Sequence, residues 1–244
     1  MKLAAVFLPF VFAIAINAGW IIDEVARYEG GEQFESRITI DAGRYTSKSE
    51  DEKLIIDLNN DTVYFVYDNI RQYFGGRLSD VVEEMRGTLM TEMSENDEMS
   101  DPHFADQGSA IAVEVKRLGD KYSAESFTGE KYQIIVDGEL KKEVYIAPAL
   151  TANREIDPKK LSRTMLMLAG AGNPTAARYV EMSDEYIKLM SKGYPIRTIE
   201  YDPGGGMVLT TIVKVEKKAI TDSEFAPPKG YAKVKSSDIY KRSQ

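Results

Sequence analysis

The clearest pattern in the chain is an alternation of apolar and polar positions in its first third. Residues 34–42 (FESRITIDA) place Ile38 and Ile40 on one face and charged side chains on the other. Such a period of two is typical of an antiparallel strand with one side in water. Residues 54–58 (LIIDL) repeat the pattern, and an Asn-Asn-Asp turn follows. The next segment, 62–67 (TVYFVY), is apolar on both faces, so we expect both of its faces to be covered.

The later strands are marked by their turns. Asp137-Gly138 is the strongest short hairpin signal in the chain, and a Pro-Gly-Gly-Gly turn separates a further pair of strands. The remaining expected strands are residues 25–28, 111–118, 131–136, 140–147, 196–201 and 207–216.

Helical periodicity interrupts the strands in two places. The first expected helix runs from about Ser79 to Met99. Its apolar stripe consists of Val82, Met85, Leu89 and Met93. Two more helices are expected to begin at Pro158 and Pro174, because each proline follows a capping residue, and the third should end at Gly193. The order strands, helix, strands, two helices, strands predicts an α+β fold.

The N-terminus has the pattern of a secretory signal peptide. Lys2 precedes an apolar run from Leu3 to Ile16, and small residues follow at Ala18 and Gly19. The run is shorter than the roughly 20 residues of a comfortable membrane span. We therefore expect export, with the periplasm as destination and cleavage near Ala18; an uncleaved anchor is the alternative.

Composition narrows the class of protein. The chain has no cysteine, which excludes a lipid-modified cysteine after the signal, disulfides and thiol catalysis. Its formal net charge is −8, and nucleic-acid binding would need a basic footprint. The expected organisation is a signal peptide (1–18), a single domain (19–231) and a polar tail (232–244). The acidic stretch 94–106 is expected to be an exposed loop.

Several stretches resemble a known family. The strand–Asp-Gly–strand segment 129–148 (GEKYQIIVDGELKKEVYIAP) resembles a signature of exported bacterial proteins of unknown function. The stretches 54–67, 192–198 (KGYPIRT) and 225–231 (FAPPKGY) fit beside it. That family is similar in layout to the periplasmic lipoprotein carriers LolA and LolB. The resemblance covers residues 25–231, and it specifies the fold better than the function.

The resemblance implies an incompletely closed antiparallel β-barrel, in which about three helices cover the mouth of a curved sheet and a hydrophobic cavity lies between them. The family tends to carry a cysteine near the central hairpin, which this chain lacks. LolA uses a specific arginine in its lipid cycle. We match no arginine here to it, since Arg37 and Arg44 lie on the polar face or at the end of an early strand.

Candidate chemistry is sparse. His103, the only histidine, lies in the acidic loop, so we expect no Ser-His-Asp site and no enzyme. Residues 57–61 (DLNND) imitate the start of a calcium loop, but a hairpin turn explains them better. The glycines 204–206 precede no Lys-Ser or Lys-Thr, so a phosphate loop is not indicated. We expect neither a cofactor nor a metal.

The methionines suggest a binding role. Eight of the ten lie in the three helical segments, and methionine adapts to apolar partners of changing shape. We expect an apolar cavity between the sheet and the helices that carries an acyl chain, a lipid or a lipidated protein. Its candidate lining residues are Ile38, Ile40, Ile56, Phe65, Tyr67, Met85, Leu89, Met93, Tyr132, Ile134, Val144, Ile146, Met165 and Met190. Two alternatives stay open: a plain filled core, and an envelope structural or sensor module that binds a protein partner.

Overall fold

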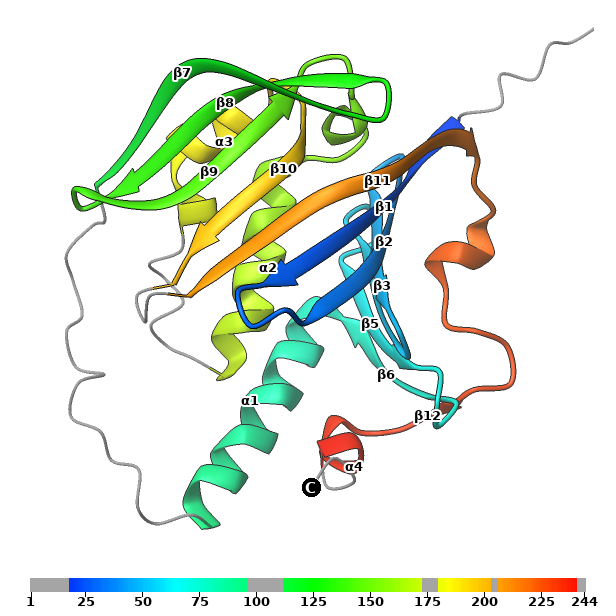
Figure 1. The fold of residues 1–244 in the computed structure, drawn as a ribbon. Coiled ribbons are helices and arrows are strands. Elements are labelled where there is room, and N and C mark those ends of the chain that lie inside the picture. The colour runs from blue at the N-terminus through cyan, green and yellow to red at the C-terminus, as the bar shows by residue number, and fades with distance from the viewer. Residues whose placement is uncertain (1–17, 96–111, 173–179, 203–205, 241–244) are drawn as a thin grey trace, which may run out of the picture.

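A single strongly curved sheet organises the protein (Figure 1). The computed structural model describes residues 18–95, 112–172, 180–202 and 206–240. The strands are β1 (Ala18–Tyr28), β2 (Gln33–Asp41), β3 (Arg44–Ser49), β4 (Glu52–Asp57), β5 (Thr62–Tyr67), β6 (Gln72–Arg77), β7 (Val113–Ala124), β8 (Phe127–Val136), β9 (Glu139–Ala147), β10 (Tyr194–Tyr201), β11 (Met207–Ala219) and β12 (Ala232–Lys233). The α-helices are α1 (Leu78–Glu95), α2 (Pro158–Gly172), α3 (Asp184–Met190) and α4 (Ser236–Tyr240).

The order of the strands confirms the expected class in a coarser form. The sheet runs β12-β6-β5-β4-β3-β2-β1-β11-β10-β9-β8-β7, and every pair is antiparallel except β12 with β6. The fold is therefore α+β with a large, curved, mostly antiparallel sheet. The sheet stays open, because β7 and β12 form its two edges and do not pair with each other. The described residues contain four α-helices where the sequence suggested about three.

The main core lies between the concave face of the sheet and the helices α1 and α2. The sheet contributes Ile22, Ile40 and Phe74, and the helices contribute Val81 and Leu168, all of them buried. A second, smaller core lies where α3 packs against the far half of the sheet. It consists of Tyr132, Ile134, Val144, Ile146, Leu189 and Met190.

The convex face carries a third cluster, which the sequence did not predict. Phe225, at the end of the short 3-10 helix Asp222–Phe225, packs against Ile55 and Val66. The outer face of β2 was expected to meet water, and this is wrong at its C-terminal end. Asp41 is buried there, because the segment after β11 crosses the neighbouring strands β3 and β4.

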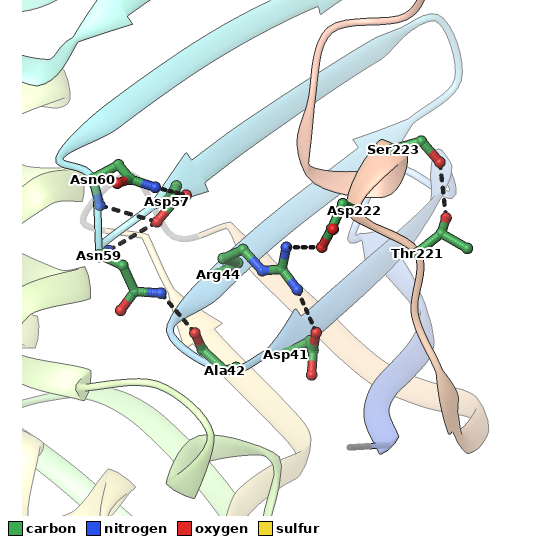
Figure 2. A network of polar contacts seen from close by, with 9 residues as sticks. All are labelled: Asp41, Ala42, Arg44, Asp57, Asn59, Asn60, Thr221, Asp222 and Ser223. Atoms are coloured by element: carbon green, nitrogen blue, oxygen red, sulfur yellow. Dashed lines mark hydrogen bonds and ion pairs between the residues drawn. The ribbon is translucent and has the colours of Figure 1, made fainter. Parts of the chain in front are cut away.

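Paired charges hold this convex segment in place (Figure 2). The Arg44 guanidinium donates to the carboxylates of Asp41 at 2.6 Å and Asp222 at 2.7 Å. It also lies 4.3 Å from the centroid of the Phe225 ring. On β4, Lys53 Nζ donates to Glu224 Oε1 at 2.7 Å. The chain thus seals this face with its own C-terminal part.

Local sequence explains where the elements begin. Asp157 accepts hydrogen bonds from the N–H groups of Lys159 and Lys160 at 2.9 and 3.1 Å, so it caps α2 as expected. The sequence predicted a single helix from Pro174 to Gly193, and this is wrong for the described part of that range. Its described part breaks into a 3-10 turn at Val180–Met182 and the short α3, whose cap is Ser183.

Other segments differ from expectation or lie outside the described residues. Strands β3 and β6 were not predicted, and β1 begins at Ala18 rather than Val25. Residues 1–17, which hold most of the expected signal peptide, lie outside the described residues, as do 96–106 of the expected acidic loop; α1 continues to Glu95. In the expected polar tail, β12 pairs with β6, and Ile239 of α4 belongs to the main core.

Candidate functional site

The concave face does not pack completely against the helices. A cavity of about 470 Å³ lies between β2, β3, β10 and the helices α2 and α3. This volume falls within the roughly 300–1,000 Å³ of small-molecule sites. Its lining residues are mainly apolar, and three are methionines: Ile40, Tyr45, Asn153, Ile156, Pro158, Leu161, Ser162, Met165, Leu166, Ala169, Glu181, Met182, Tyr186, Met190, Tyr194 and Pro195.

A second hollow of about 250 Å³ adjoins the first. Both are lined by Tyr45 and Met165, so these two side chains stand where the hollows meet. The second hollow is also lined by Leu54, Phe65 and Tyr67 of the sheet. We call the two hollows together the groove. It follows the concave face from β10 towards β5.

The amphipathic pattern of α2 builds one wall of the groove. Leu161, Met165 and Leu168 recur at helical spacing, so they share the face that is turned to the sheet. Leu168 is buried in the main core, whereas Met165 is only half-buried. The helix therefore packs tightly towards its C-terminus and leaves space beside its middle.

A carboxyl group lies beside Tyr194, one of the residues that line the groove. Tyr194 Oη donates a hydrogen bond of 2.8 Å to Oε1 of Glu24. Burial raises the pKa of Glu24, and the hydrogen bond from Tyr194 offsets only part of that effect. Burial and the nearby Glu24 carboxyl also raise the pKa of Tyr45 and of Tyr194, so both phenols stay protonated at neutral pH.

A second polar cluster closes the end of the groove at β9. Lys142 Nζ forms ion pairs with Glu181 and, at 3.0 Å, with Glu200. Burial lowers the pKa of Lys142, but Tyr186 and the two carboxylates outweigh it, so the pKa is raised overall. Burial raises the pKa of Tyr186 to about 12. The two carboxylates of this cluster share a cation, whereas Glu24 has none in an ion pair among the described residues.

Comparison with known proteins identifies the family. The family model described as "Domain of unknown function (DUF4412)" matches residues 103–231, which is more than half of the chain. The chain belongs to the DUF4412 family. The expectation of a domain-of-unknown-function family is thereby confirmed. The DUF4412 region supplies α2, α3 and β10, whereas Ile40 and Tyr45 on the opposite wall of the groove precede it, as does Glu24. No curated protein sequence matches the chain.

Two solved structures of other proteins match the chain with low scores. PNGF-II matches this DUF4412 protein with a TM-score of 0.42 at 12% identity over 92% of this chain. The chain spans only 32% of the PNGF-II chain. The LolA superfamily protein NE2245 from Nitrosomonas europaea matches with a TM-score of 0.32 at 7% identity, over 87% of this chain and 91% of its own. Both TM-scores are below 0.5.

The residues that were predicted to line the cavity lie partly in the groove and partly in the two cores. Five of them line the groove: Ile40, Phe65, Tyr67, Met165 and Met190. Seven others pack in the main core or beneath α3: Ile38, Ile56, Met85, Tyr132, Ile134, Val144 and Ile146. The side chains of Leu89 and Met93 lie outside the described part of the structure. Met182, which was not among the predicted lining residues, lines the groove as well.

Sequence reasoning missed the polar members of the site. Tyr45 lies on the unpredicted strand β3, and Glu24 lies just before the strand that was expected to begin at Val25. Tyr194 belongs to the stretch 192–198, which was used only as a family signature. One signal was available: alternation from Ile22 places Glu24 on the same face of β1.

The remaining candidate sites from the sequence are the calcium-like turn, His103 and the glycine turn. Asp57 Oδ1 accepts hydrogen bonds from the N–H groups of Asn59 and Asn60, so these residues form the hairpin turn between β4 and β5, as expected (Figure 2). His103 and residues 203–205 lie outside the described residues. Within the described part, no group of three His, Cys, Asp or Glu side chains is arranged to hold a metal ion. No described helix is long and apolar enough to cross a membrane.

Proposed function

We propose that this protein is a non-enzymatic binding or carrier protein for an apolar ligand, such as an acyl chain, a lipid or the lipid part of a lipoprotein. The groove between the concave face and α2 would hold the ligand. The observation that carries the proposal is the apolar lining of the 470 Å³ cavity, with Met165, Met182 and Met190 on its helical side. Flexible thioether side chains adjust to guests of different shape.

The expected export fits this role and is part of the proposal. A carrier that works in the periplasm meets lipids and lipoproteins there, and its ligand needs shielding from water because exposed apolar surface is unfavourable. No cofactor is required for such binding.

The test fills the groove from one position. Met165 is half-buried and stands where both hollows meet, so Met165→Trp should exclude a guest while adding volume to existing space. We expect a fluorescent fatty acid to bind the wild type and to lose at least about tenfold in affinity in the variant, a loss of ~1.4 kcal/mol. Met207→Trp is the matched control, because Met207 is an exposed residue of β11 outside the groove; its affinity should equal the wild-type value.

Lipid mass spectrometry of natively purified protein supplies an independent readout. Lipid recovered from the wild type and depleted in Met165→Trp supports a carrier. If neither the fluorescent fatty acid nor any lipid associates with the wild type, the proposal is wrong.

The half of the sheet that packs against α3 favours a second function, that of a structural or sensor module. There Ile134, Val144 and Leu189 are fully buried in a filled core, as in a structural or sensor module that binds a protein partner rather than a ligand. Such a module should co-purify with one stoichiometric envelope protein, and Met165→Trp should leave that partner bound.

A further inference from the structure

The position of Glu24 follows from the alternation of β1. Ile22 is fully buried in the main core, and the register pairs Ile22 with Ile38 and Glu24 with Ser36 on β2. On the other side, Glu24 pairs with the buried Ile212 of β11. Glu24 therefore points to the concave face, where its side chain is half-buried. A carboxyl group at this place has apolar neighbours along its own strand.

Glu24 differs from the other interior acids in having no cation beside it. Asp41 pairs with Arg44 at 2.6 Å, and Glu143 pairs with Lys131 at 2.9 Å. In the described part of the chain, no lysine or arginine forms an ion pair with Glu24, whose hydrogen-bond donor is the Tyr194 hydroxyl. An unpaired carboxylate in an apolar site is costly, so a cationic ligand that reached Glu24 would give it the charge partner that the described chain does not supply.

Glu24 is not itself a lining residue of either hollow of the groove; it is bonded to Tyr194, which is one. Glu24 borders a separate hollow together with Arg37 and Lys48, and these two cations are bonded to Asp23 and Asp68. The groove supplies no positive charge to Glu24 either. None of the residues lining its larger hollow is a lysine or arginine. The smaller hollow is bordered by Lys53, but Lys53 Nζ is bonded to Glu224 on the convex face. Ser47, Ser49 and the acidic Glu52 line the same hollow. The polar residues that line the groove are thus mainly hydroxyls and carboxylates, with the amide of Asn153 and the paired Lys53 beside them.

Resting on the function proposed above, we propose that the ligand of the groove is an apolar chain that carries a protonated amine, and that Glu24 receives this ammonium group. The apolar chain lies along Met165 and Leu161. The ammonium donates to the Glu24 carboxylate and to the hydroxyl oxygens of Tyr194 and Tyr45. Three acceptors suit a group with three N–H donors and no acceptor, as in the ammonium of Lys.

The test compares head groups on one chain length. Dodecylamine, dodecanol and dodecanoic acid, each below its critical micelle concentration, displace a fluorescent apolar probe from the full-length protein at neutral pH. We expect dodecylamine to bind at least about tenfold more tightly than dodecanol, as one charge-assisted hydrogen bond would allow. Dodecanoic acid should bind more weakly than dodecanol.

The variants assign the preference to Glu24. Glu24→Gln keeps the shape of the side chain and removes its charge, so it should lose the preference for dodecylamine over dodecanol. Glu35→Gln is the matched control, since Glu35 is an exposed neighbour on the same sheet, and it should keep the preference. Tyr194→Phe should keep most of it, because the carboxylate remains.

The outcomes separate the two proposals. If all three compounds displace the probe with equal affinity, or if Glu24→Gln retains the preference, the ammonium site is wrong while the apolar groove stands. If none of the compounds displaces the probe, the groove does not bind apolar chains, and both proposals are wrong.

Discussion

The two faces of one sheet handle buried surface in opposite ways. On the convex face, Phe225 fills the space over Ile55 and Val66, and Arg44 meets the carboxylate of Asp41 at 2.6 Å. On the concave face, a cavity remains beside α2, and Glu24 lacks a cation among the described residues. Both faces bury many apolar side chains. Residual volume and the pairing of charges are therefore what distinguish a sealed face from a site that can receive a ligand.

Truncation of the convex anchor should have the largest effect. Phe225→Ala should lower the free energy of unfolding by about 3–5 kcal/mol, because it empties a buried site. Met165→Ala, which only widens an existing hollow, should cost about 1 kcal/mol, less than truncation of a fully buried Met. Urea unfolding measures both. Equal losses would mean that the two faces are packed alike, contrary to the comparison.

The ion pairs of Arg44 test the sealed face more finely. Asp41→Ala should cost about 3 kcal/mol, since the Asp41 side chain is 8% exposed and its loss leaves a half-buried guanidinium short of a partner. Asp222→Ala removes the other partner of the same Arg44, but the Asp222 side chain is 94% exposed, and the loss should stay within about 1 kcal/mol. A larger loss for Asp222 than for Asp41 in the same urea measurement would contradict this ranking.

Much of the fold could be predicted because apolar alternation reports burial directly. The segment TVYFVY became β5 with the expected limits, and its parity placed Phe65 and Tyr67 on the concave face. Strand β3 (RYTSKS) gives no such signal, because hydroxyl groups occupy most of its inward positions. In β6, Gly75 has φ 145°, and a Cβ there would lie 2.3 Å from the Val63 carbonyl oxygen. This strand needs glycine because the neighbouring backbone of β5 comes so close. In the sequence, however, glycine is typical of the end of a strand, so the strand was not predicted.

The candidate site was less predictable, because it depends on where packing stops. Periodicity identifies Met165 and Ile146 equally as inward residues, yet the first borders a cavity and the second is buried in a filled core. Only the three-dimensional distance between α2 and the sheet separates them. Glu24 was missed for a related reason: its role depends on Tyr194, a residue far along the chain that the fold brings within 2.8 Å.

The smallest expected effect is the contribution of Glu24, on the concave face, to the pH dependence of stability. Burial raises the folded-state pKa of Glu24 above the ordinary value of 4.5 that applies in the unfolded chain. Between these two values the folded state binds more protons than the unfolded state, so stability falls as the pH rises. Below 4.5 the carboxyl is neutral in both states and the penalty is absent. Glu24→Gln should therefore raise Tm at pH 7, and this gain should disappear under acidic conditions.

Thermal unfolding of the wild type and of Glu24→Gln across this pH range measures the effect. Tyr45 and Tyr194 face the carboxyl and stay neutral throughout, so neither contributes to the slope. Glu35→Gln should show no comparable gain, because Glu35 is exposed. A lower Tm for Glu24→Gln at pH 7 would reveal that the carboxylate stabilises the folded protein. Glu24 would then belong with the paired acids of the sealed face, and the reason to expect an ammonium ligand in the groove would disappear.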